Sequence, residues 1–150
     1  MAANHNNQLE TLLKFEQKKE EQAENMLRNA ENDYQQNITR LQSVADYRLE
    51  YMNRLSQRSL HGVDSATYNH YHAFIKKLDY ASEQVKIAMH QAKALVEQSK
   101  ERWIKQRQKV QAVEMLTAKR NSVLMKKESK KEQSMFDEIS TQQFLRRRSQ

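Results

Sequence analysis

The chain has 150 residues, of which 30% are charged and 37% hydrophobic, and it carries a net charge of +7. Its mean hydropathy is −1.05, and this abundance of charged, helix-forming residues is typical of a coiled coil rather than of a compact domain. There is no cysteine, which excludes a disulfide framework and a cysteine-based metal site and fits a reducing cytosol. No stretch has the apolar length of a signal peptide or a membrane span, so we expect any membrane contact to be peripheral or through a partner.

The first predicted helix covers about residues 8–58, after a polar segment, residues 1–8, that we expect to be frayed. Within it, seam residues follow one another in steps of four and three, the spacing of a left-handed coiled coil. Two polar residues, Asn37 and Arg48, interrupt this seam, and such residues usually fix the register of the helices at a cost in stability. The predicted seam is Ala23, Leu27, Ala30, Tyr34, Asn37, Leu41, Val44, Arg48, Tyr51 and Leu55.

A turn is predicted at residues 59–65, because Gly62 is the only glycine and the chain has no proline. Glycine can adopt the positive φ that ends a helix, and Asp64 or Ser65 can cap the first amides of the next one. The alternative is that Gly62 is tolerated inside one continuous helix, at a cost of ~1 kcal/mol relative to alanine.

The second predicted helix covers about residues 66–143. Its apolar stripe passes through Tyr71, Leu78, Val85 and Ala92, which are seven residues apart. We expect the stripe to weaken at Ser99, Arg102 and Gln106, and then to resume on a slightly rotated face through Trp103, Val110, Val113, Leu116, Val123 and Leu124. The predicted fold is therefore all-α: one domain, residues 1–150, in which two long helices form an antiparallel coiled-coil hairpin with a frayed or partner-ordered C-terminal overhang.

This fold argues against an enzyme. Two helices offer no concave pocket in which catalytic groups could converge, and a single glycine cannot build a phosphate-cradling loop. His70 and His72 are two residues apart and would point about 200° from each other on a helix. We therefore expect no catalytic residue, no metal site and no cofactor.

Aromatic residues gather on both sides of the predicted turn. Tyr51 and Tyr71 fall on the two seams, whereas Tyr47, Phe74 and Leu78 broaden the apolar surface beyond what a two-helix seam requires. This surplus is either ordinary core or a docking patch for a third element, and the sequence leaves both interpretations open.

The positive charge is concentrated in the last third of the chain. Residues 100–150 hold 14 Lys or Arg against 6 Asp or Glu, whereas residues 1–58 hold 8 against 9 and residues 59–99 hold 4 against 4. The basic third is either a solubilising helix face or a contact for an acidic protein surface or nucleic acid.

Several segments resemble the FliJ family of the bacterial flagellar type III export apparatus. They are Asp46-Tyr47-Arg48-Leu49-Glu50-Tyr51, Tyr71-His72-Ala73-Phe74-Ile75-Lys76-Lys77-Leu78, Glu83-Gln84, Trp103 with Lys105 and Arg107, and residues 130–138. The resemblance implies an antiparallel coiled coil similar to the axle subunit of rotary ATP synthases. It also implies a non-enzymatic stalk that links the hexameric export ATPase to the export gate protein in the membrane and handles export chaperones, at the cytoplasmic face of the inner membrane.

The resemblance also implies two sets of contact residues. The export gate would dock on Tyr47, Tyr51, Phe74, Leu78 and Ala81, while Val85 departs from the family pattern. The open end, residues ~9–25 with ~105–135, would enter the ATPase ring, with contacts from Lys105, Arg107, Lys109, Lys119 and Arg120.

Three alternatives differ in class or in setting. The first is the equivalent stalk of a virulence type III secretion system, and the second is a self-associating filament component. The third is a nucleic-acid-binding coiled coil, which we disfavour because the basic third has one tryptophan and few aromatic residues for base stacking. The expected partners therefore include neither nucleic acid nor direct insertion into a membrane.

Overall fold

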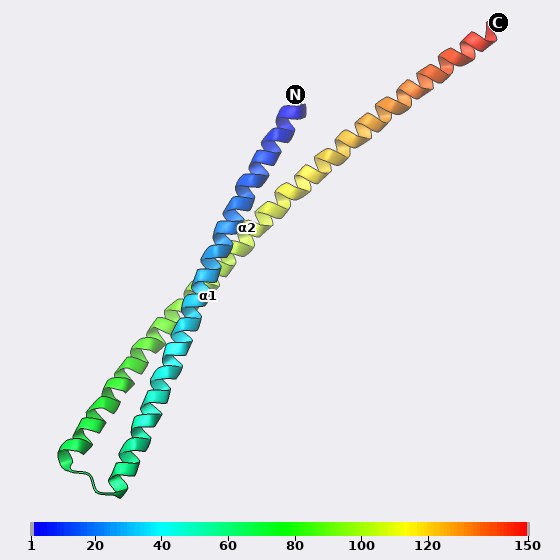
Figure 1. The fold of residues 1–150 in the computed structure, drawn as a ribbon. Coiled ribbons are helices and arrows are strands. Elements are labelled where there is room, and N and C mark those ends of the chain that lie inside the picture. The colour runs from blue at the N-terminus through cyan, green and yellow to red at the C-terminus, as the bar shows by residue number, and fades with distance from the viewer. Residues whose placement is uncertain (1, 150) are drawn as a thin grey trace. The chain divides into compact units, whose positions relative to one another are not determined.

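The structure, a computed structural model, describes residues 2–149, with side chains from residue 4 onward. These residues form two α-helices, α1 (Ala2–Leu60) and α2 (Ser65–Arg148), and contain no strand (Figure 1). The predicted all-α helical hairpin is thereby confirmed. Met1 and Gln150, which the predicted domain included, lie outside the described residues.

Two compact units make up the hairpin. The turn unit is Glu20–Lys105, and the terminal unit combines Met1–Lys19 with Gln106–Gln150. Each unit contains part of α1 and part of α2, so each can be described as a helix pair.

Both helices are longer than the predicted ranges of 8–58 and 66–143. No proline or glycine interrupts either one, and polar side chains do not end a helix by themselves. Near the start of α1 the Thr11 hydroxyl donates to the Asn7 carbonyl oxygen at 2.8 Å, and after the end of α2 the Ser149 amide donates to the Leu145 carbonyl oxygen at 3.2 Å.

The turn has the predicted chemistry at both of its ends. Gly62 has a φ of 83°, and the His61 amide donates to the Arg58 carbonyl oxygen at 3.1 Å, which closes the end of α1. The Asp64 carboxylate accepts the Thr67 amide at 3.1 Å and so caps the start of α2. Hydrogen bonds from Thr67 hold the pKa of Asp64 below its ordinary value, because they favour the charged carboxylate. The alternative of one continuous helix is wrong.

In the turn unit the predicted α1 seam is sheltered along its whole length except at Arg48, which is exposed. The least exposed side chains of the unit are Ala30, Asn37, Ile75, Ala92 and Ser99, at 4–6%. Asn37 satisfies its amide within its own helix, because Nδ2 donates to the Asp33 carbonyl oxygen at 3.1 Å. The small residues among this set allow the two helices to approach closely.

The seam residues of α2 continue in steps of four and three after Ser99, where the stripe was expected to move to a slightly rotated face of the helix. In the turn unit Ser99 is buried and Trp103 is half-buried, whereas Arg102 is exposed, so the predicted place of Arg102 in the stripe is wrong. The reason is the 3.5-residue period of a supercoiled seam, which selects the residue four positions after Ser99 rather than three. Leu116 and Val123, expected on the resumed stripe, are 56% and 47% exposed.

The terminal unit has a partly polar seam. Gln106 Nε2 donates both to the Glu16 carbonyl oxygen at 3.0 Å and to the Glu16 carboxylate. Val110 and Val113 are the buried apolar residues of this unit, at 4% and 8% exposure. Every described residue after Leu124 is exposed, so residues 125–149, called the tail below, form the expected overhang and are helical to Arg148.

Candidate partner-binding surfaces

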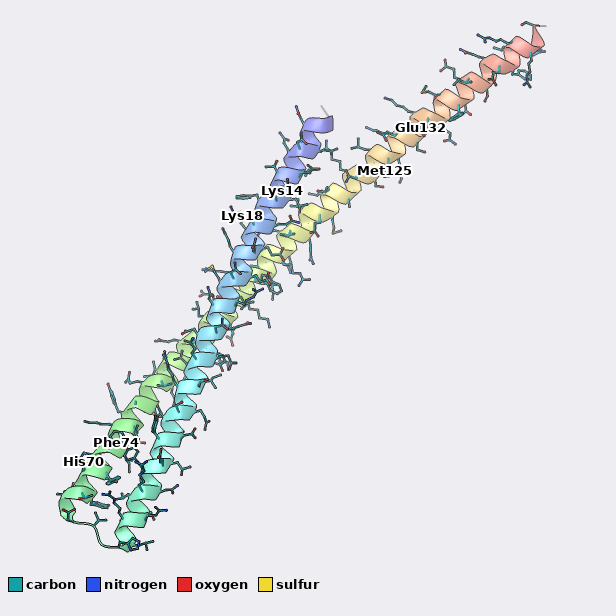
Figure 2. All side chains as sticks on the ribbon, viewed as in Figure 1. Lys14, Lys18, His70, Phe74, Met125 and Glu132 are labelled. Carbon is teal, nitrogen blue, oxygen red and sulfur yellow. The ribbon has the colours of Figure 1, made fainter. Side chains whose placement is uncertain are left out.

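An aromatic cluster joins the two helices of the turn unit. The Tyr51 ring lies 4.3 Å from the Phe74 ring and 6.0 Å from the Tyr71 ring, measured between centroids. All three side chains are half-buried, and Phe74 is labelled in Figure 2. These rings therefore pack within the hairpin, so Tyr51 and Phe74 belong to its core as well as to the predicted gate contacts.

Around this cluster, one side of the helix pair is apolar. Tyr47, Phe74 and Ala81 each stand one residue before a seam position, and in an antiparallel pair such positions line the same side. Tyr47 is 56% exposed, whereas Phe74, Ala81 and the seam residue Leu78 are half-buried. We call Tyr47, Tyr51, Phe74, Leu78 and Ala81 the aromatic patch. The structure brings Tyr51 and Phe74 into contact and leaves Tyr47 as the most exposed of the five.

Two arginines beside the patch were missed from the sequence. The Arg54 guanidinium lies 5.4 Å from the Tyr51 ring centroid, and the Arg58 guanidinium lies 5.5 Å from that of Tyr71. Arg54 also pairs with Glu50 at 2.6 Å. The available signal was spacing, because Arg54 follows Tyr51 by three positions and the two therefore share a helix face.

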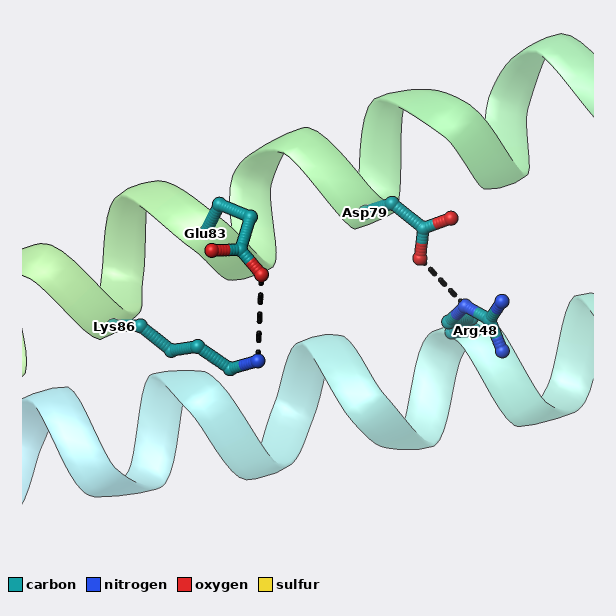
Figure 3. A network of polar contacts seen from close by, with 4 residues as sticks. All are labelled: Arg48, Asp79, Glu83 and Lys86. Carbon is teal, nitrogen blue, oxygen red and sulfur yellow. Dashed lines mark hydrogen bonds and ion pairs between the residues drawn. The ribbon is translucent and has the colours of Figure 1, made fainter.

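The opposite side of the turn unit is charged. Arg48 Nε lies 2.6 Å from the Asp79 carboxylate across the two helices, and Lys86 lies 3.4 Å from Glu83 within α2 (Figure 3). Asp79 stands one residue after the seam residue Leu78, so it lies across the seam from Phe74. The side chains of Arg48 and Asp79 are 44% and 51% exposed. An ion pair this exposed adds little to the free energy of unfolding, so its main effect is on the register of the two helices.

The five predicted basic contacts are divided between the two units. Lys105 belongs to the turn unit, and the other four belong to the terminal unit. Arg107 follows the seam residue Gln106 and Lys109 precedes the seam residue Val110, so they flank the seam on opposite sides.

Lys119 and Arg120 come together in the terminal unit, where they line a shallow apolar groove with Leu9, Leu116 and Val123. Arg120 is half-buried at a seam position, and Lys119 is exposed. The groove therefore combines exposed aliphatic surface with two cations, a combination that suits an amphipathic partner.

Two further observations concern the part of the chain that the structure describes. No three of its His, Asp or Glu residues come together in the way metal ligands do. Neither of its helices has a stretch that is long and apolar enough to cross a bilayer.

Comparison with known proteins gives a consistent family assignment. The family model described as flagellar FliJ protein matches residues 5–149. The flagellar FliJ protein of Salmonella typhi is 26% identical over 139 residues, which is 93% of this chain and 95% of that protein. The flagellar FliJ protein of Escherichia coli strain K12 matches with the same identity and coverage. Since the match extends over nearly the whole hairpin, the chain belongs to the FliJ family of flagellar proteins.

Proposed function

We propose that this chain is a non-enzymatic stalk of the flagellar type III export apparatus. It links the hexameric export ATPase to the export gate in the membrane and handles export chaperones, at the cytoplasmic face of the inner membrane. Family membership supports the flagellar role. The structural observation that carries the proposal is that the two units expose different chemistry: an aromatic patch on the turn unit, and exposed lysines with an apolar groove on the terminal unit.

The aromatic patch is the proposed docking surface for the export gate. Tyr47 offers a large, half-exposed ring beside side chains that the hairpin covers only in part. A partner that covers this area gains about 25 cal/mol for each Å² of apolar surface removed from water, and aromatic anchors usually dominate such contacts.

The basic residues of the terminal unit, with Lys105, are the proposed contacts for the ATPase ring. Exposed lysines favour encounter with an acidic surface and give an association rate that falls as salt rises. The groove beside Lys119 adds an apolar contact that salt does not screen.

The ring contact is tested with purified chain and purified flagellar export ATPase. We expect binding together with faster ATP hydrolysis. Lys105→Glu combined with Lys119→Glu should weaken both, because each change replaces a cation that attracts an acidic surface with an anion that repels it. Lys76→Glu with Lys77→Glu, which makes the same charge change in the turn unit, serves as the control. Absence of binding at physiological salt would contradict the proposal.

The gate contact is tested with the cytoplasmic domain of the gate protein. Phe74→Ala with Leu78→Ala should weaken binding by about tenfold or more, which corresponds to about 1.4 kcal/mol. Since Phe74 packs on Tyr51, circular dichroism must show that helicity is kept. Tyr47→Ala is the sharper variant, because it removes exposed surface and leaves the packed rings in place. Unchanged binding by both variants would remove the patch from the gate contact.

A further inference from the structure

One helix face of the tail, which the hairpin does not use, carries apolar residues between charged and polar ones. Its members follow one another in steps of three and four, and none is covered in the structure: Met125, Glu128, Glu132, Met135, Ile139, Gln142 and Arg146, called the tail seam. Met125, Met135 and Ile139 are 71%, 62% and 48% exposed, and Phe136 beside them is 71% exposed. Met125 and Glu132 are labelled on the tail in Figure 2.

The tail seam is not a continuation of the hairpin seam. The α2 seam of the terminal unit ends at Leu124, and its steps of three and four would next select polar residues: Lys127, Lys131, Ser134, Glu138 and Thr141. The tail seam lies one residue further round the helix, a rotation of about 100°. A longer α1 would therefore cover this line, which is polar up to Thr141, and would leave Met125, Met135 and Ile139 of the tail seam in water.

Charge is distributed along the tail seam in a self-complementary order. Acidic residues, Glu128 and Glu132, come first, the apolar residues Met135 and Ile139 are central, and Arg146 comes last. Neither acid nor Arg146 has an ion-pair partner within residues 4–149. When this sequence is placed against a reversed copy of itself, Glu128 can meet Arg146, Met135 meets Ile139, and Glu132 meets the amide of Gln142.

We propose that the tails of two copies of this chain pair in antiparallel fashion and form a homodimer. In the register that aligns the charges, Glu128 of each copy lies beside Arg146 of the second copy, and Met135 lies beside Ile139 of the second copy. The two Phe136 rings then meet next to the two-fold axis. The contact is isologous, so it closes at two chains and does not propagate.

One contact in this register is unfavourable. On the side of the axis away from Phe136, the Glu138 carboxylates of the two copies face each other, and like charges in such flanking positions weaken a coiled coil. Repulsion between the two Glu138 carboxylates therefore makes the dimer weaker than its other contacts alone would make it. This pairing does not rest on the proposed role in export.

Sedimentation equilibrium of the full chain, from low to high micromolar concentration, tests the proposal. The average mass should rise from that of one chain to that of two and no further. Phe136→Asp should raise the dissociation constant about tenfold or more, because it places a charge at the centre of the contact. Tyr80→Asp, at an aromatic residue of the turn unit with a similar 69% exposure, should leave it unchanged. A chain that stays monomeric at every concentration, or that assembles beyond two, overturns the proposal.

A charge exchange tests the register separately. Glu128→Arg and Arg146→Glu should each weaken the dimer, and the double variant should restore it, because each new arginine then meets a new glutamate. Glu138→Gln should tighten the dimer by removing the one repulsive contact. A double variant that stays as weak as the single variants, with helicity unchanged, overturns the antiparallel register.

Discussion

The turn unit and the terminal unit share one seam spacing but fill it differently. In the turn unit the buried seam residues are Ala30, Ile75 and Ala92 together with the polar Asn37 and Ser99. The described part of the terminal unit, in contrast, buries only Val110 and Val113 and pairs Glu16 with Gln106 at seam positions. Spacing therefore determines where two helices touch, and the chemistry of the seam residues determines how firmly they hold. We expect the terminal unit to open at a lower free energy than the turn unit.

The largest expected effect comes from the core of the turn unit. Ile75→Ala should lower the free energy of unfolding by about 2 kcal/mol, because it removes a buried side chain that two helices alone cannot repack around. Urea denaturation followed by circular dichroism measures this. Ile87→Ala, at a residue that is 52% exposed, should cost less than about 0.5 kcal/mol. Equal effects at both positions would mean that the turn unit has no defined core.

An intermediate effect is expected in the terminal unit. Gln106→Leu should destabilise it by about 1 kcal/mol, because the part-buried Glu16 side chain loses its hydrogen-bond donor. Gln106→Leu combined with Glu16→Leu should recover that loss and exceed the starting stability, since both seam positions then become apolar. Hydrogen exchange of the amides around residues 9–16 reports this locally. Faster amide exchange in the double leucine variant than in the original chain would show that the polar seam pair is not what weakens the terminal unit.

The smallest expected effect is a pH dependence at the turn. The pKa of Asp64 is lowered in the folded chain, so the cap should be fully effective above the ordinary carboxyl pKa of 3.8 and be lost as pH falls through the lower folded value. Amide exchange in the first turn of α2 should therefore speed up, relative to the intrinsic rate, below about pH 4. Asp64→Asn should abolish this dependence, because asparagine also caps but does not titrate. A pH response that survives in Asp64→Asn would assign the effect to another group.

Much of the fold could be predicted from the positions of glycine and proline and from the spacing of apolar residues. One glycine and no proline left a single place for a turn, and Asp64 caps α2 as its position suggested. The α1 seam from Ala23 to Leu55 is sheltered as predicted except at Arg48, because alternate steps of four and three leave little choice of face.

The seam of the terminal unit and the register near Ser99 could not be predicted, because a search for apolar spacing does not detect seam positions that polar residues occupy. Gln106 was predicted on the α2 stripe, but Glu16 lies before the predicted α1 seam and is recognised only by its contact with Gln106. Arg102 was placed on the seam for the same reason, since Ser99 gave no apolar anchor for the register, whereas Trp103 is half-buried as expected of a stripe residue. Among the proposed contacts, the sequence indicated aromatic residues, but only the structure shows that Phe74 packs on Tyr51 while Tyr47 remains exposed.

The single turn also determines how the chain is made. Tyr51 and Tyr71 are close in sequence and can meet soon after synthesis, whereas Glu16 and Gln106 are 90 residues apart. A ribosome adds about 5–20 residues per second. The segment of α2 that pairs with the start of α1 is therefore synthesised several seconds later than the segment that pairs with the end of α1. Loop closure also favours pairing from the turn outward. The apolar residues around Leu9 and Leu13 are therefore the last to be covered, and a nascent chain is most open to misassociation at its N-terminal part.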